Sequence, residues 1–134
     1  MKTKKYLTIA STSMLIAIIL GAMGAHYLKE TLELPTEKLE SWKTAVFYQI
    51  IHSLSILIIA VLATTIKIDK IGIVVNLFLI GMLCFSGSIY FLSLNYIWKI
   101  EALKFLGPIT PIGGMLFIAG WIVLIFKLKG IKSN

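Results

Sequence analysis

Four long apolar stretches without charged residues alternate with short charged segments along the chain. They cover residues 6–28, 44–66, 71–97 and 105–126. A helix needs about 20 residues to cross a hydrocarbon core of about 30 Å at about 1.5 Å per residue, and each stretch reaches that length. The pattern therefore predicts an all-α fold, an integral membrane four-helix bundle that residues 1–134 form as a single domain.

The composition also favours a lipid environment. Hydrophobic residues make up 58% of the chain and charged residues 14%, whereas a soluble domain has about 25% charged residues. The net charge of +7 comes from lysines alone, which lie in short tracts between the apolar stretches. Without arginine the chain cannot make bidentate contacts to phosphates or bases, so we expect no nucleic-acid partner.

The distribution of the lysines predicts the orientation, because cytoplasmic segments retain positive charge. With the N-terminus inside, the cytoplasmic segments carry the whole net charge and the outer loops balance to zero. The cytoplasmic charged residues are then Lys2, Lys4, Lys5, Lys67, Lys70, Asp69, Lys127, Lys129 and Lys132. We expect a multi-pass protein of the plasma membrane with both termini cytoplasmic. A cleaved signal peptide is the alternative for the first span, although its apolar run exceeds the usual 7–15 residues.

The loop before the second span predicts a helix that begins outside the membrane. Pro35 and Thr36 followed by Glu37 are typical of a helix start. Trp42 is then expected at the outer interface, where the amphipathic indole ring often anchors a span. Residues expected at a similar depth are Tyr27, Tyr96 and Trp98.

The first span carries small residues at helical spacing. Ser13, Ala17, Gly21 and Ala25 lie four residues apart and so share one face. Small side chains let helix backbones approach closely in lipid. This face predicts a tight contact, with another helix of the same chain or with a second copy.

Histidines near and within the spans are the first candidates for a site. His26 ends the first span, and Tyr48, Gln49 and His52 lie on the second. An imidazole at membrane depth can tie helices together by hydrogen bonds, or it can bind a ligand or move a proton. The spans contain no acidic residue that could complete a metal site, so we expect no metal and no cofactor.

The third span contains a serine–glycine segment. Ser86, Gly87 and Ser88 are followed by Tyr90. Glycine flanked by serines favours close helix contact and hydrogen bonds between helices, and the same hydroxyls could line a polar site.

The fourth span begins with residues that no uninterrupted helix would choose. Pro108, Thr110, Pro111, Gly113 and Gly114 follow one another closely, and proline and glycine both weaken a helix. We expect the outer end of this helix to be broken or re-entrant. Backbone N–H and C=O groups that lose their helical hydrogen bonds at membrane depth must face protein or a water-filled cavity. We therefore expect the segment to be buried among the other helices, either as a kinked helix start or as the lining of a pocket.

These polar features all fall in the half of the bilayer that we assign to the outside. The sequence therefore predicts one polar cluster or shallow cavity there, contributed by four spans. Its candidate residues are His26, Tyr48, Gln49, His52, Ser86, Ser88, Tyr90 and Thr110.

The motifs together resemble the domain of unknown function 423 family, small membrane proteins that include YgdD- and YwdK-like members. The resemblance rests on GAMGAH at residues 21–26, FSGSIY at 85–90, LGPITPIGG at 106–114 and AGW at 119–121. It also includes Trp42, Ala45, Tyr48, Gln49 and His52. The resemblance implies a four-helix membrane fold, and it implies no activity.

Three functions are compatible with these residues. The favoured hypothesis is a non-catalytic protein that binds membrane lipid, a small apolar ligand, another membrane protein or itself. The alternative is a small oligomeric transporter or channel, suggested by the broken fourth helix and the histidines. An enzyme that uses His26 or His52 as a general base beside a hydroxyl is the third hypothesis, and we do not favour it.

Overall fold

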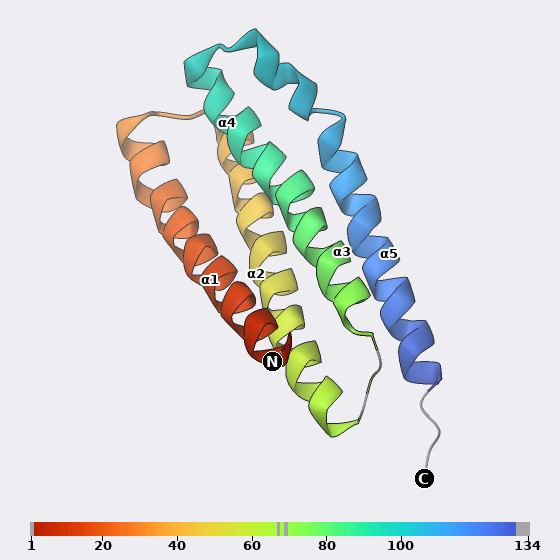
Figure 1. Ribbon diagram of the computed structural model, residues 1–134. Helices are drawn as coiled ribbons and strands as arrows, with labels where there is room; N and C mark the ends of the chain where they lie inside the picture. Colours follow the sequence, from red (N-terminus) through yellow and green to blue (C-terminus); the bar gives the residue numbers. More distant parts are fainter. Residues whose placement is uncertain (1, 67, 69, 131–134) are drawn as a thin grey trace.

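Four long helical segments run side by side in the computed structural model, which describes residues 2–66, 68 and 70–130 (Figure 1). The α-helices are α1 (Lys2–Met23), α2 (Thr36–Thr65), α3 (Gly72–Met82), α4 (Ser88–Trp98) and α5 (Ile109–Lys129). Three further helical segments are the π-helices η1 (Gly24–Thr31) and η2 (Leu83–Gly87) and the 3-10 helix η3 (Glu101–Leu106). No strand occurs among the described residues. The predicted all-α bundle is confirmed.

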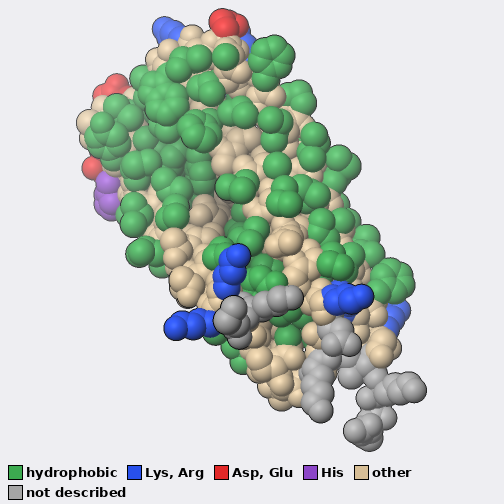
Figure 2. Space-filling view, viewed as in Figure 1, with side chains coloured by type: hydrophobic (Ala, Val, Ile, Leu, Met, Phe, Trp, Pro, Cys, Tyr) green, Lys and Arg blue, Asp and Glu red, His purple; other side chains and the backbone are tan. Residues whose placement is uncertain are grey.

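Each of the four segments is long and apolar enough to cross a membrane. The candidate spans are Thr3–Thr31, Thr36–Thr65, Gly72–Trp98 and Glu101–Lys129. Figure 2 shows hydrophobic side chains covering the surface between the two ends of the bundle. Lipid can solvate such a surface, so the fold is that of a multi-pass membrane protein.

The two ends of the bundle differ in charge. α1 begins and α5 ends at the same end as the connection between α2 and α3 (Figure 1). In Figure 2 this end carries lysine side chains, while the acidic side chains in view gather at the opposite end. Lysines described at this end are Lys4, Lys5, Lys70, Lys127 and Lys129. Lys67, Asp69 and Lys132, which we also expected on this side, lie outside the described residues.

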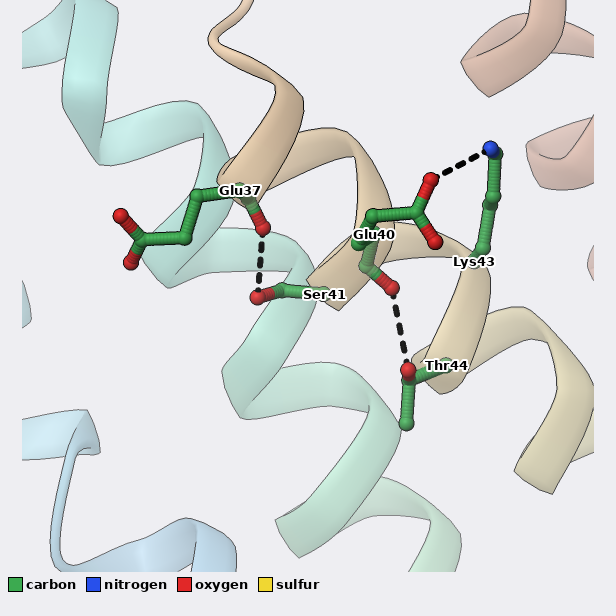
Figure 3. Close-up of polar contacts among 5 residues, drawn as sticks. All are labelled: Glu37, Glu40, Ser41, Lys43 and Thr44. Atoms are coloured by element: carbon green, nitrogen blue, oxygen red, sulfur yellow. Dashed lines mark hydrogen bonds and ion pairs between the residues drawn. The ribbon is translucent and has the colours of Figure 1, made fainter.

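Helix α2 begins with a charged turn, as predicted. Its first residue is Thr36, and Pro35 precedes it in an extended conformation. Figure 3 shows the polar contacts of these turns, where Lys43 pairs with Glu40 at 2.7 Å and Ser41 donates to the carbonyl oxygen of Glu37 at 2.9 Å. These exposed groups need water, so α2 begins beyond the apolar band.

The packing gives the bundle two close pairs and two wider seams. α1 packs along α2, and α5 packs along α3 and η2. The continuous third segment of α3, η2 and α4 also contacts α2, so these two segments form the centre. One wider seam separates α1 from the third segment, and the other separates α2 from α5.

Close approaches between helices occur at several glycines. A Cβ atom at Gly24 would lie 2.6 Å from Trp42, and one at Gly120 would lie 2.5 Å from Phe78. A Cβ at Gly113 would overlap the backbone of Phe85, so α5 contacts η2 almost backbone to backbone. Small residues therefore bring the helices together, as expected in lipid.

The glycines and alanines that we singled out differ in their surroundings. A Cβ at Gly21 would meet Val46 at 3.4 Å, whereas Gly87 and Gly114 have nothing nearer than 4.0 Å and 3.9 Å. Ala17 is fully buried, but Ala25, which lies in η1, is exposed. The sequence pattern missed the contacts of Gly24, Gly81 and Gly120.

The fourth segment is broken at its start, and the expectation that this break is buried is wrong. η3 ends at Leu106, and α5 begins only at Ile109. Only Gly113 is buried between residues 107 and 114, while Pro108 and Pro111 are exposed. The backbone at the break can be exposed because it is hydrogen-bonded to residues close in the chain. Gly107 N donates to Lys104 O at 3.1 Å, and Thr110 N donates to Gly107 O at 3.3 Å. Pro111 falls in the first turn of α5, where its missing N–H is tolerated.

We predicted from its position that Trp42 is an interfacial anchor, and this prediction is wrong. Its side chain is 1% exposed. The indole Nε1 donates to the carbonyl oxygen of Leu20 at 2.8 Å, and the ring packs against Tyr90 with centroids 4.6 Å apart. Gly24 leaves the space that the ring fills. Trp42 therefore ties α1, α2 and α4 together inside the bundle.

Candidate functional site

A hydrogen-bonded network joins α1, α2 and α4 inside the bundle. Gln49 Nε2 donates to the carbonyl oxygen of Ser13 at 3.0 Å, and Gln49 Oε1 accepts from the hydroxyl of Tyr90 at 2.9 Å. Ser53 Oγ donates to Ser13 Oγ at 2.8 Å and lies 3.6 Å from the sulfur of Met82. Each of these buried polar groups has a partner within the protein, so the network serves to hold helices together.

Two further serines also have hydrogen-bond partners within the protein. Ser86 Oγ donates to the carbonyl oxygen of Ala45 at 2.8 Å and so fastens η2 to α2. Ser88 Oγ donates to Phe85 O at 2.9 Å and shares a 2.6 Å hydrogen bond with Thr110 Oγ1. The hydroxyls expected to line a site are thus engaged with one another or with the backbone.

His52 differs from these residues because one of its two ring nitrogens has no hydrogen-bond partner among the described residues. Nδ1 lies 2.8 Å from the carbonyl oxygen of Tyr48. A carbonyl can only accept, so Nδ1 carries the proton and Nε2 of a neutral ring is an acceptor. Nε2 is buried and has no hydrogen-bond partner among the described residues. An unsatisfied buried group of this kind disfavours the folded state by about 1–3 kcal/mol.

Aromatic rings surround His52. The imidazole stacks on Phe117 with centroids 3.6 Å apart and planes 10° apart, and Tyr48 lies nearly parallel to both rings. Phe78 meets the imidazole edge-on at 5.0 Å, and Trp121 is tilted to it at 6.3 Å. The ring is therefore held in one orientation by contacts from α2, α3 and α5.

A groove of about 410 Å³ opens beside this histidine in the seam between α2 and α5. Its lining residues are Tyr48, His52, Phe85, Pro111, Gly114, Met115, Phe117, Ile118 and Trp121. None of these described residues carries a formal charge, and several of the apolar side chains at the rim are exposed to the surroundings of the bundle. The groove can therefore be entered sideways, from lipid.

The other seam forms a larger and more apolar groove. It measures about 570 Å³ between α1 and the third segment, and Gln49 and Tyr90 contribute to its lining. Because the amide and phenol are already bonded to each other, this groove offers apolar surface more than polar partners.

The predicted single cluster is divided in the structure. Gln49 and Tyr90 face α1, Tyr48 and His52 face α5, and Ser88 and Thr110 bond to each other. His26 joins none of them, since its side chain is 77% exposed and its Nδ1 lies 4.0 Å from the carboxylate of Glu30.

Several residues of these networks were not among our candidates. Ser13 and Ser53 complete the Gln49 network, while Phe78, Phe117 and Trp121 enclose His52. Residues 117 and 121 are four apart, a helical spacing that could have marked an aromatic face of α5. Which helix that face meets depends on the tertiary packing.

General-base catalysis needs a hydroxyl within hydrogen-bond reach of the imidazole. No hydroxyl among the described residues bonds to His26 or to His52. The same residues contain no group of three histidine, cysteine or acidic side chains placed to hold a metal ion. The chemistry that remains open to His52 Nε2 in a neutral ring is acceptance of a hydrogen bond.

Comparison with known proteins identifies relatives along nearly the whole chain. The family model described as "Protein of unknown function (DUF423)" matches residues 20–114. A UPF0382 membrane protein of Staphylococcus aureus is 38% identical over 130 residues, which cover 95% of this chain and 99% of that protein. The UPF0382 membrane protein YwdK of Bacillus subtilis is 37% identical over 125 residues, covering 91% of this chain and 94% of YwdK. No solved structure matches significantly.

Proposed function

The chain belongs to the DUF423 family, and we propose that it is a non-catalytic membrane protein that binds a neutral, membrane-soluble molecule. Its curated relatives are named UPF0382 membrane proteins, so the proposal is argued from the residues of this chain. The proposed site is the groove between α2 and α5. The observation that supports it is His52 Nε2, a buried acceptor without a partner in the described part of the protein. A ligand with an O–H or N–H group would supply the missing hydrogen bond.

The groove favours an uncharged ligand. A phosphate or carboxylate placed against these uncharged residues would lose its hydration without gaining an ion pair, which is strongly unfavourable. Neutral molecules that already partition into the bilayer avoid this penalty. Exposed Met115 and Ile118 at the groove offer apolar surface along which a hydrocarbon tail could lie.

Transport through the bundle fits these contacts less well. A polar path across the membrane needs side chains that remain available to a passing solute. In this bundle Gln49, Ser53, Ser86 and Tyr90 bond to other groups of the protein. We therefore prefer a binding role to a transporter or channel.

The proposal includes a location in the plasma membrane with both termini on the cytoplasmic side. The support is the charge difference between the two ends of the bundle, since lysine-rich segments remain on the cytoplasmic side during insertion. The groove beside His52 would then open in the half of the bilayer nearer the outside.

The binding proposal can be tested by taking the protein from membranes into nanodiscs and measuring by mass spectrometry which small molecules stay bound to the intact protein. We expect a neutral molecule to remain bound to the wild-type chain and to be depleted in His52→Phe, which keeps an aromatic ring against Phe117 but has no acceptor. His26→Phe is the matched control, because that exposed histidine lies outside the groove. Equal ligand content in all three proteins would refute the proposal.

A further inference from the structure

The groove between α2 and α5 contains two kinds of recognition element, a hydrogen-bond acceptor and a set of flat rings. The acceptor is His52 Nε2, whose orientation is fixed because Nδ1 is held by Tyr48 O at 2.8 Å. His52 is 3% exposed, so the acceptor is available to a group inside the protein and withdrawn from bulk water.

Three of the rings lie nearly parallel. The planes of His52 and Phe117 differ by 10°, those of Tyr48 and His52 by 18°, and those of Tyr48 and Phe117 by 24°. Parallel aromatic faces are complementary to another flat ring, which can stack on them or meet them edge-on. A flexible acyl chain has no flat face that could stack in this way.

The entrance to the groove leaves room for such a ring. Gly114 has only the Phe85 ring near it, at 3.9 Å, so the surface of α5 is indented there. Trp121 is 40% exposed, and its ring centroid lies 6.3 Å from that of His52. His52 is itself one of the lining residues, so a ring seated in the groove lies beside the imidazole that carries Nε2.

We infer that the groove binds a hydroquinone, the reduced form of a membrane quinone, with one hydroxyl donating to His52 Nε2 and the ring against Tyr48 and Phe117. This inference rests on the proposed binding function and specifies its ligand. A hydroquinone is neutral, flat, soluble in lipid and a hydrogen-bond donor, and these are the four properties the groove selects. The step is binding alone, with no transfer of electrons.

The oxidised quinone provides a direct comparison. It has nearly the same ring and tail, but its oxygens are carbonyls that cannot donate to Nε2. A neutral hydrogen bond that is made by one ligand and lost by the other corresponds to about a tenfold difference in affinity. The protein should therefore bind the hydroquinone about tenfold more tightly than the quinone.

The experiment titrates a short-tailed hydroquinone and its quinone, under anaerobic conditions, into nanodiscs with and without the protein. Binding is measured calorimetrically, and empty nanodiscs give the partitioning baseline. In His52→Phe the preference for the hydroquinone should disappear, while His26→Phe should retain it. Equal affinity of the wild type for both ligands, or a preference that survives in His52→Phe, would overturn the inference.

A second variant covers the case in which His52→Phe fails to fold. Gly114→Leu fills the indentation of the groove and leaves His52 in place. It should weaken hydroquinone binding by about tenfold or more, since the ring loses its space. Unchanged binding by a folded Gly114→Leu protein would also contradict the inference.

A long-chain primary alcohol separates this inference from the proposed function. The alcohol has a hydroxyl donor and an apolar tail but no ring. If it binds in a His52-dependent way and the hydroquinone does not, the ligand class is wrong and the binding function stands. If neither ligand binds and His52→Phe loses no co-purifying molecule, both proposals are wrong.

Discussion

Two neighbouring residues on α2 show how differently a polar side chain can be accommodated in an apolar bundle. The amide nitrogen of Gln49 donates a hydrogen bond to Ser13, and its amide oxygen accepts one from Tyr90. His52, three residues later, uses one nitrogen and leaves the other without a partner among the described residues. Burial without a partner is unfavourable, so Gln49 serves stability while His52 is the side chain that a ligand could complete.

The Gln49–Tyr90 hydrogen bond predicts a measurable coupling. Gln49→Leu and Tyr90→Phe should each destabilise the protein, and the double variant should be destabilised by less than the sum. We expect a coupling free energy of about 0.6 kcal/mol and at most about 1.7 kcal/mol, the range found for hydrogen bonds between membrane helices. Unfolding in mixed detergent and dodecyl sulfate gives these values.

Tyr96→Phe is the control for this cycle, because Tyr96 is an exposed tyrosine on the same helix. It should leave stability unchanged and show no coupling to Gln49→Leu. Additive effects of Gln49→Leu and Tyr90→Phe would show that the 2.9 Å contact contributes no stability.

Residue types alone suggested the candidate residues, but they did not predict the surroundings of these side chains. His26 and His52 look alike in the sequence, yet one is exposed and the other is enclosed by rings. Trp42 had the position of an interfacial anchor, but Gly24 on the facing helix leaves a space that the indole fills. These differences depend on which helix faces which, and a single span does not contain that information.

Adjacent glycines on α5 show what determines the distance between two elements. Gly113 lies against the backbone of Phe85 in η2, which cannot yield as a flexible side chain can. A Cβ atom at Gly114, the next residue, would make an ordinary van der Waals contact with the Phe85 ring at 3.9 Å. Only one of the two is needed for α5 to approach η2 closely.

Gly113→Ala and Gly114→Ala should therefore have different effects on stability. The first forces α5 away from η2 and should destabilise the protein by about 1–3 kcal/mol, the usual effect of overpacking. The second should be neutral or slightly stabilising, because alanine favours a helix more than glycine does. Thermal unfolding in detergent compares the two, and equal melting temperatures would contradict the contact.

The end of α4 holds a lysine in the left-handed region. Lys99 has φ of 54°, a conformation that glycine adopts without strain. Lys99→Gly should relieve up to about 1 kcal/mol and raise the melting temperature. Lys99→Ala keeps the β-carbon and should show no gain. A similar rise for both variants would mean that loss of the charge, and not the backbone, is responsible.

The sequence predicted the elements well because lipid imposes a length and a polarity on every span. The start of α2 at Thr36 and the break near Pro108 also followed from local residue types. The π-helical turns of η1 and η2 were not predicted. η2 lies where Gly113 brings α5 against Phe85, so its wider turn accompanies a tertiary contact that has no marker in the residues 83–87 themselves.

For the whole molecule, the uneven charge of the two ends predicts one orientation. The sequence has one cysteine, Cys84, which is first replaced by serine. A new single cysteine at Lys5, near the start of α1, then marks the lysine-rich end, and one at Lys38, near the start of α2, marks the opposite end. A membrane-impermeant maleimide should label Lys38→Cys in intact cells, and Lys5→Cys only after permeabilisation, since positive segments stay inside. The reverse labelling, or labelling of both, would contradict the proposed orientation.

The pairing of the helices bears on how the protein is made. The two closest pairs, α1 with α2 and the third segment with α5, each join spans that follow one another in the chain. A ribosome would release the first pair before the second has been synthesised, and neither pair needs a distant segment to form. Contacts between sequence neighbours form fastest. Biogenesis thus reduces to two hairpins that meet along α2 and the third segment, and the proposed groove is complete only after the second hairpin has joined the first.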